Sequence, residues 1–352
     1  MDLNHARLPI PPHPHSHAHA LRRAALMNNT GLATRPQGRI RLSLYNQGKE
    51  SQPFDLKGGI MAEPKVYFTK EISPEALQKA FDALGATLKP KCAVKISTGE
   101  PGNKHYLQPS LIEGLVKSVD GTIVECNTAY PGKRDTTEAH WKTFEDHGFT
   151  DIAPCDLMDE AGEMTLPVKD GFHLDFNIVG AHLAEYSSML MLSHFKGHPM
   201  GGFGGALKNM SIGVASSRGK MKIHTSGEAD GTFDDLMNGD HDSFIRSMAD
   251  ADQSVMDYMG RENIVYVNIA NNLSVDCDCV ADPEAPAMAD IGIFASTDPV
   301  AVDQACIDAV YASDDPGNAA MVERIESRNG LLLLEAAEQH GLGSRKYELV
   351  TL

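Results

Sequence analysis

Short apolar runs alternate along this chain with longer segments in which apolar residues recur every three or four positions. Short runs bounded by turn residues favour buried strands, whereas the helical spacing favours amphipathic helices. Because the two alternate with short connections, the pattern predicts an α/β fold with a mainly parallel sheet flanked by helices. We expect one domain over residues 61–352, or two lobes that share a crevice. Strands are expected at residues 65–68, 92–96, 122–126, 188–192, 265–269 and 290–294.

The clearest helix signals lie at residues 73–85, where Ser73 is in the N-cap position, Pro74 opens the helix and Gly85 ends it. Residues 163–182 predict a hairpin followed by an amphipathic piece. The Gly-, Asp- and Thr-rich residues 225–245 predict a loop or an insertion. Further helices are expected at 109–119, 136–147 and 247–259.

Polar side chains follow most of the predicted strands. In an open parallel sheet, ligands bind beyond the carboxyl ends of the strands, so these groups would converge on one crevice if all the strands are parallel. Lys95, Glu100, His194 and His198 are the candidates for catalysis or for shaping the pocket. The groups that follow the strands also include Asn103, Asn127, Tyr130, Lys133, Arg134, Lys196, Asn271, Asn272, residues 276–279, residues 296–298 and Asp303.

The most unusual segment, residues 193–209, combines a dense glycine run with two histidines and two lysines. Glycine lets backbone N–H groups approach a ligand, and a helix is expected to begin after the run. The segment therefore predicts an anion cradle at a helix N-terminus. The alternative is that the glycines allow close packing of the backbone, since the run matches no nucleotide-binding motif. The anion-binding candidates are Lys196, Gly201, Gly202, Gly204, Gly205, Lys208, Asn209 and Lys220.

Cys277 and Cys279 form a C-x-C pair flanked by aspartates. An extended backbone would point both sulfurs to one side, which suits a single metal ion or the edge of a cluster. His194, His198 and His224 are the histidines that could complete a Cys/His ligand set. The alternatives are that the cysteines pack as buried or free thiols and that the histidines are satisfied polar residues.

The net charge of the whole chain is −17, although residues 1–60 are basic. A body this acidic argues against binding to nucleic acid or to an anionic membrane. The six cysteines are dispersed, which favours the reducing cytoplasm over a secreted disulfide scaffold. No apolar run reaches the roughly 18 residues of a membrane-spanning helix.

Residues 1–60 are expected to lie outside the folded domain. Residues 13–20 alternate histidine with small residues and could bind metal weakly. The arginine-rich composition is also compatible with an organelle targeting peptide. The favoured interpretation is translated upstream DNA with Met61 as the natural start, because residues 57–61 can be encoded by a purine-rich ribosome-binding site followed by a start codon.

Over residues 65–348 the chain resembles the domain-of-unknown-function family 362, often called iron–sulfur centre proteins. The resemblance implies an iron–sulfur or metal centre in a redox-linked protein. Many relatives carry a cysteine-rich ferredoxin-like insert after the segment that matches residues 220–224, but here residues 225–261 stand in that place without a cysteine. The matching stretches are V-K-I-S-T-G-E-P-G-N (94–103), N-T-A-Y-P-G-K-R (127–134), residues 193–209, A-S-S-R-G-K-M-K-I-H (215–224), D-C-D-C (276–279) and residues 290–305.

The sequence therefore leaves three functions open. The first is a cytoplasmic enzyme that uses an iron–sulfur cluster or a single transition metal ion, is linked to redox chemistry and acts on a small anionic molecule. Its cluster would rest on Cys277, Cys279 and non-cysteine ligands, or on a separate ferredoxin partner. The second is a non-catalytic metal-binding or electron-transfer accessory protein. The third is a metal-independent enzyme for a phosphorylated or carboxylated substrate.

Overall fold

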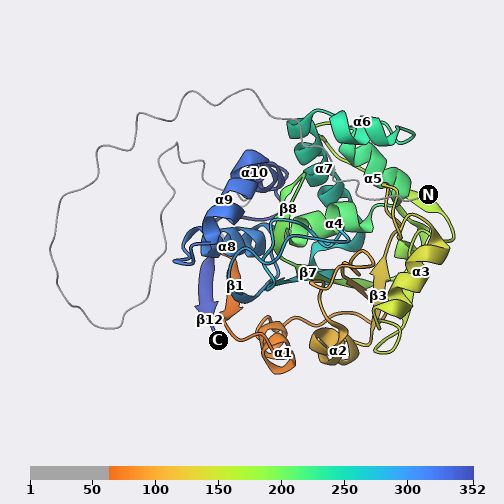
Figure 1. Cartoon of the computed structure of the whole chain (residues 1–352). Helices are drawn as coiled ribbons and strands as arrows, with labels where there is room; N and C mark the ends of the chain where they lie inside the picture. The colour runs from red at the N-terminus through yellow and green to blue at the C-terminus, as the bar shows by residue number, and fades with distance from the viewer. Residues whose placement is uncertain (1–62) are drawn as a thin grey trace, which may run out of the picture. The chain divides into compact units, whose positions relative to one another are not determined.

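A central eight-stranded sheet organises the protein, whose computed structural model describes residues 63–352 (Figure 1). The strand order is β12-β1-β11-β10-β7-β2-β3-β4. The predictions for residues 1–60, including Met61 as the start, lie outside the described residues. The strands are β1 (Lys65–Thr69), β2 (Cys92–Lys95), β3 (Gly121–Glu125), β4 (Cys155–Leu157), β7 (Ser188–His194), β10 (Ile264–Ala270), β11 (Gly292–Ser296) and β12 (Glu348–Thr351).

All strands of this sheet run in one direction except β11, which is antiparallel to both of its neighbours, β10 and β1. The prediction of an α/β fold with a mainly parallel sheet is confirmed. The expectation for residues 296–298 is wrong, because the end of β11 lies at the opposite edge from the ends of β2, β3, β7 and β10. The connection from β10 to β11 contains no helix, so the chain returns without the crossover that a parallel neighbour requires.

Helices cover both faces of the sheet. Successive strand residues pack against opposite faces, as Ala93 and Val94 do, so the strands read as continuous apolar runs. One face packs against α1 (Pro74–Asp82), α2 (Pro109–Ser118) and α3 (Thr137–Asp146). The other face packs directly against α4 (Ala206–Val214) and α8 (Pro299–Tyr311). The same apolar cluster also contains residues of α5 (Ser217–His224), α7 (His241–Met259), α9 (Asn318–Ser327) and α10 (Leu331–Gln339).

Local signals set several element ends. The Ser73 hydroxyl accepts the N–H of Ala76, Pro74 is the first residue of α1, and Gly85 has a φ of 60°. β5 (Glu163–Pro167) and β6 (Phe176–Gly180) form the expected antiparallel hairpin. Residues 225–245, predicted to be a loop or an insertion, are not a plain loop, because they contain α6 (Phe233–Asn238) and the first residues of α7.

The correction at residues 225–245 has a local cause. Thr232 and Asp235 form a reciprocal capping box at α6, and Asp240 caps α7 by accepting the N–H of Ser243. Asp and Thr are favourable at helix N-caps although they are poor inside helices. The residues that suggested a loop are therefore the start signals of two helices.

Candidate functional site

Buried charged side chains gather at the carboxyl ends of β2, β3 and β7. Such burial is unusual, since charged groups are costly to remove from water unless they are paired. We call this set the ionic cluster. Its members are Lys95, Glu100, Glu125, Arg134, His194, Lys196 and Asp278, all of them buried.

Glu125, at the end of β3, is the central acceptor of the ionic cluster. It lies 2.7 Å from Lys95 Nζ and 3.5 Å from Arg134, and it accepts the N–H of Thr98 at 2.9 Å. Burial alone would raise the pKa of Glu125, but the charges of Lys95 and Arg134 outweigh it and lower this pKa to about 2. Glu125 is therefore ionised and holds two cations in place.

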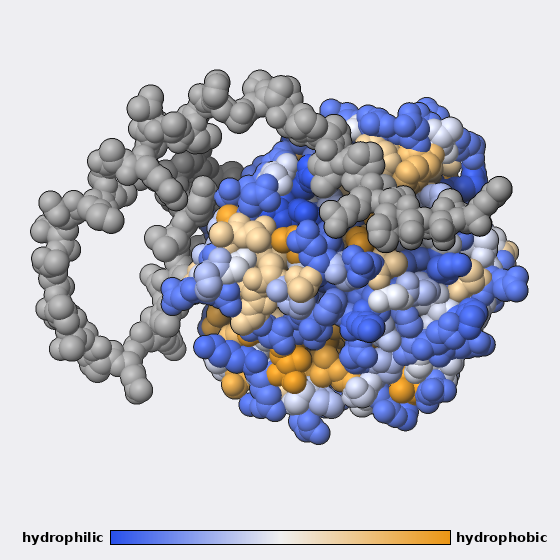
Figure 2. Space-filling model, in the orientation of Figure 1, coloured by the Kyte–Doolittle hydropathy of each residue, from blue (hydrophilic) through white to orange (hydrophobic). Residues whose placement is uncertain are grey.

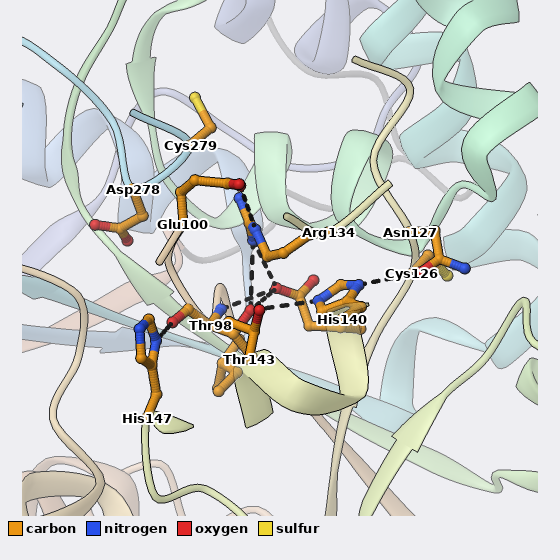
Figure 3. A network of polar contacts seen from close by, with 12 residues as sticks. Thr98, Glu100, Cys126, Asn127, Arg134, His140, Thr143, His147, Asp278 and Cys279 are labelled. Atoms are coloured by element: carbon orange, nitrogen blue, oxygen red, sulfur yellow. Dashed lines mark hydrogen bonds and ion pairs between the residues drawn. The ribbon is translucent and has the colours of Figure 1, made fainter. Parts of the chain in front are cut away.

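Arg134 joins Glu125 to Glu100, and Figure 3 shows its contact with Glu100. Its Nε donates to Glu100 Oε2 at 3.0 Å, and its Nη2 donates to the Tyr130 hydroxyl at 2.9 Å. The backbone N–H of Glu100 donates to the carbonyl of Asp278 at 2.7 Å. The loop after β2 is thereby tied both to the loop after β3 and to the loop after β10.

His140, on α3, completes this network as a neutral group. Its Nδ1 lies 3.2 Å from Asn127 Oδ1, and its Nε2 lies 3.4 Å from Thr98 Oγ1. Burial lowers the pKa of His140 to about 3. Sequence reasoning missed both His140 and Glu125, because each lies inside a helix or strand pattern that reads as structural.

Asp278 is the shared partner of His194, on β7, and of Lys196, on the strand after it. His194 Nδ1 lies 3.0 Å from one carboxylate oxygen of Asp278, and Lys196 Nζ donates to the other at 2.8 Å. His194 Nε2 faces the carbonyl of Asn271 at 2.7 Å, so both ring nitrogens face acceptors. Burial opposes ionisation of Asp278, but His194 and Lys196 outweigh it and lower its pKa well below the usual range.

The predicted catalytic residues Lys95, Glu100 and His194 are thus held in structural contacts. Lys95 Nζ is shared among Glu125, Asn209 Oδ1 and a backbone carbonyl. The side-chain amide of Asn209 also donates to the carbonyl of Lys95 at 2.9 Å. Asn209, predicted to bind an anion, therefore links α4 to β2 instead.

Lys208, in the first turn of α4, differs from the other lysines of this region. It is partly exposed, and its ammonium has no hydrogen bond or ion pair with any described residue. Desolvation of the amine and the positive charge of Lys95 outweigh the attraction of Asp278 and lower the pKa of Lys208 to about 8. A cation in the first helical turn is also unfavourable in the field of the helix dipole. Lys208 is therefore an unpaired cation in an unfavourable position.

The predicted anion cradle at the start of α4 is filled by the protein itself. Asp303 Oδ1 accepts the N–H of Ala206 at 2.7 Å, and its Oδ2 accepts the N–H of Leu207 at 3.0 Å. A Cβ at Gly205 would lie 2.4 Å from Asp303 Oδ1. The backbone groups that were expected to hold a ligand hold this carboxylate, so the anion-binding prediction needs correction for Gly205.

The other glycines of the segment serve close packing and tight turns. A Cβ at Gly197 would lie 2.6 Å from the backbone of Val275, and Gly202 has a φ of 79° beside the backbone of Gly330. Gly201 lies in the turn of the short antiparallel hairpin formed by β8 (Lys196–His198) and β9 (Gly202–Gly204), and Gly204 is the last residue of β9. Packing of backbone against backbone, the alternative interpretation, explains Gly197 and Gly202.

Lys220 and His224, on α5, do not belong to the group of candidate metal ligands that contains Cys277 and Cys279. Lys220 Nζ donates to the carbonyl of Ala215 at 2.6 Å, and burial lowers its pKa. His224 Nδ1 lies 2.7 Å from the carbonyl of Lys220, and its ring stacks on Phe244. The structure therefore does not place His224 in the predicted metal set, nor Lys220 as an open anion contact.

Cys277, Cys279 and His198 form a group that could hold a metal ion. One candidate ligand atom from each lies within 4.8 Å of the others. The two sulfurs are joined in a disulfide, so in this state they are neither free thiols nor metal ligands. His198 Nδ1 accepts the N–H groups of Met200 and Gly201. Metal-bound histidines instead donate from the second ring nitrogen, so His198 would have to change its hydrogen bonds to bind metal.

A second such group, Asp156, Glu160 and His182, lies elsewhere. Its members already have partners, as in the 2.8 Å contact of His182 Nδ1 with Asp156. Two surface hollows of about 310 and 330 Å³ lie beside His340 and Arg218, and neither is lined by Lys208. None of the helices in residues 63–352 combines the length and apolar character needed to cross a bilayer.

The fold and the ionic cluster define an α/β protein with paired charges buried at the carboxyl ends of its parallel strands. A family model described as a domain of unknown function (DUF362) matches residues 92–308, and the chain belongs to this family. No curated protein matches the chain.

Solved structures show weaker likeness. The lactate racemase apoprotein from Thermoanaerobacterium thermosaccharolyticum has a TM-score of 0.35 and 11% identity, over 58% of this chain and 50% of that one. A structural-genomics protein from Thermotoga maritima has a TM-score of 0.37 and 13% identity, over 76% of this chain and 58% of that one. The chain thus spans half of the first structure and 58% of the second. The comparisons establish the family and no reaction.

Proposed function

We propose that this protein is an enzyme that binds a small carboxylated or phosphorylated molecule, with Lys208 as the residue that contacts the anion. The observation that carries this proposal is the ammonium of Lys208, which is unpaired beside a buried ionic cluster. The cations around it are already engaged, since Lys95 contacts Glu125 and Lys196 contacts Asp278. An anionic ligand would supply the partner that Lys208 lacks.

The chemistry of Lys208 suits proton transfer. A general acid or base works best when its pKa lies near the working pH, and the pKa of Lys208 is lowered to about 8. The protonated amine holds an anion and can give up its proton, and the neutral amine can take one back.

Binding is tested by calorimetric titration of the whole chain with inorganic phosphate and with malonate. Lys208→Met should abolish binding of both ions, because it removes the charge and keeps most of the stem. Lys104→Met is the matched control, since Lys104 is an exposed lysine on the loop after β2. Equal binding by wild type and Lys208→Met would overturn the proposal.

Proton transfer is tested with a panel of small carboxylates and phosphate monoesters incubated with the protein in D₂O. NMR should show protein-dependent exchange of a carbon-bound hydrogen in at least one compound, and Lys208→Met should lose it. Anion binding without hydrogen exchange in any compound would show that the protein binds anions but does not catalyse proton transfer.

A metal-dependent function is the second candidate, favoured by the convergence of His198, Cys277 and Cys279. A four-iron cluster takes four thiolates, so two cysteines and one histidine do not fit it. A single transition metal ion would fit after reduction of the disulfide and reorientation of His198. Anaerobic titration of the reduced protein with Zn²⁺ tests this, since Cys277→Ser/Cys279→Ser should lose any stoichiometric binding.

A further inference from the structure

The disulfide Cys277–Cys279 has an accessible side and a protected side. Cys279 is partly exposed, whereas Cys277 is 7% exposed. The four remaining cysteines are free thiols. Burial raises the pKa of Cys92 to about 11 and that of Cys155 to about 12, which makes them poor nucleophiles. Cys277 and Cys279 are thus the pair placed for exchange.

The surroundings of this pair suit reversible opening. The N–H of Cys279 donates to Cys277 Sγ at 3.3 Å, a bond that would stabilise a thiolate on that sulfur. A ring nitrogen of His198 lies within 4.8 Å of both sulfurs. An attacking thiol would therefore reach Cys279 from solvent. The sulfur that leaves would be that of Cys277, whose thiolate is stabilised by the N–H of Cys279.

We propose that Cys277 and Cys279 form a thiol–disulfide exchange site that takes two electrons from a dithiol. A thiolate of the dithiol attacks Cys279 Sγ, the bond between the two protein sulfurs breaks, and Cys277 leaves as the thiolate. The second thiol of the reductant then attacks the mixed disulfide and releases Cys279. The dithiol ends as a cyclic disulfide, and two protons from the dithiol accompany the two electrons.

The residue between the cysteines couples this exchange to the ionic cluster. Asp278 holds Lys196 at 2.8 Å and His194 at 3.0 Å, and its carbonyl accepts the N–H of Glu100 at 2.7 Å. The disulfide closes a short ring around Asp278 and so fixes where its carboxylate points. Opening this ring frees Asp278 to move away from Lys196, which then becomes available to an anion.

Reduction should therefore tighten anion binding, a consequence that rests on the proposed function of Lys208. We expect a gain of about fivefold or more, the lower end of typical coupling between two sites. The exchange itself does not depend on anion binding and is measured separately.

Exchange is tested by differential alkylation of the whole native chain. Free thiols are blocked with N-ethylmaleimide, the protein is reduced with dithiothreitol, and the new thiols are labelled with iodoacetamide. Mass spectrometry should place the second label on Cys277 and Cys279 together and not on Cys155, the partly exposed control. As a check, the protein is first oxidised with diamide and then treated with N-ethylmaleimide before any reduction. If both Cys277 and Cys279 are labelled at that stage, they do not form a disulfide and the proposal is overturned.

Coupling is tested by titrating oxidised and reduced protein with sulfate. The reduced form should bind more tightly, and Asp278→Asn, which can still form the disulfide, should bind equally in both redox states. Equal affinity of both wild-type forms would refute the coupling and leave the exchange site standing. Absence of binding in both forms would instead count against the proposed function and against the coupling that rests on it.

Discussion

The carboxylate of Asp303, on α8, lies directly against Gly205, the residue that precedes α4. A Cβ at Gly205 would come within 2.4 Å of Asp303 Oδ1, which also accepts the N–H of Ala206 at 2.7 Å. Asn268 donates to the same oxygen at 2.6 Å. The start of α4 and the position of Lys208 therefore depend on one buried carboxylate.

Replacing Gly205 by alanine should destabilise the protein by roughly 1–3 kcal/mol, the usual cost of overpacking. The added methyl must push the Asp303 carboxylate away from the helix N-terminus. Urea denaturation measures the loss. Gly204→Ala is the control, because its Cβ would meet only Lys208 Cδ at 3.9 Å. Similar stability of the two variants would show that a methyl group at residue 205 does not disturb the contact of Asp303 with the start of α4.

Lys208→Met should leave the protein as stable as the wild type or raise its stability by about 0.5–1 kcal/mol. The substitution removes an unpaired cation from the first turn of a helix. Lys220→Met should lower stability, since the ammonium of Lys220 donates to the carbonyl of Ala215. Thermal unfolding of both variants checks this contrast. A marked loss of stability in Lys208→Met would reveal a structural partner for that lysine.

Anion affinity should fall as the pH rises through about 8, where Lys208 loses its proton. Above that pH the affinity should drop roughly tenfold per pH unit if the protonated amine is required. Sulfate is a suitable probe because its own charge stays constant over neutral and alkaline pH. In Lys208→Arg the side chain remains charged, so any binding that survives should show no fall near pH 8.

Glu125 should make the folded protein sensitive to acid. Its pKa is about 2 in the folded protein against 4.5 for the free side chain, so the unfolded chain binds this proton more tightly. The corresponding stability, about 3 kcal/mol, is complete above pH 4.5 and is lost as the pH falls toward 2.

The acid sensitivity is checked by comparing Glu125→Gln with Glu113→Gln in urea denaturation at several pH values. Glu125→Gln should be less stable at neutral pH by roughly 3–5 kcal/mol, because the buried Lys95 loses its counter-ion and Arg134 keeps only Glu100. Its stability should also change less below pH 4.5 than that of the wild type. Glu113 is exposed, so its variant should follow the wild type.

Local patterns were enough to place most helices and strands. The caps of α1 and α3 depend on residues within three positions of the helix start, as Ser73 and Thr136 show. The α/β class followed from the same patterns. Residues 225–245 were misjudged because Asp and Thr, read one by one, favour loops, whereas at N-cap positions they begin helices.

The sequence predicted where the candidate site lies, but it did not predict which of its charged residues are paired with one another. Lys208 was among the predicted anion-binding residues, but nothing in its neighbourhood along the chain distinguishes it from Lys196. The difference lies in Asp278, which is 82 residues away from Lys196 and neutralises it. Only contacts between distant segments show which cation is already paired.

The sequence alone determined the class of fold, the ends of its best-capped helices and the region where polar groups follow parallel strands. These properties depend on side-chain periodicity and on contacts within a few residues. The tertiary structure decided the reversed direction of β11, the filling of the helix start by Asp303 and the isolation of Lys208. The direction of β11 depends on a connection from β10 that contains no crossover helix. The other two depend on which distant charged groups meet in a buried space, where an ion without a partner is costly.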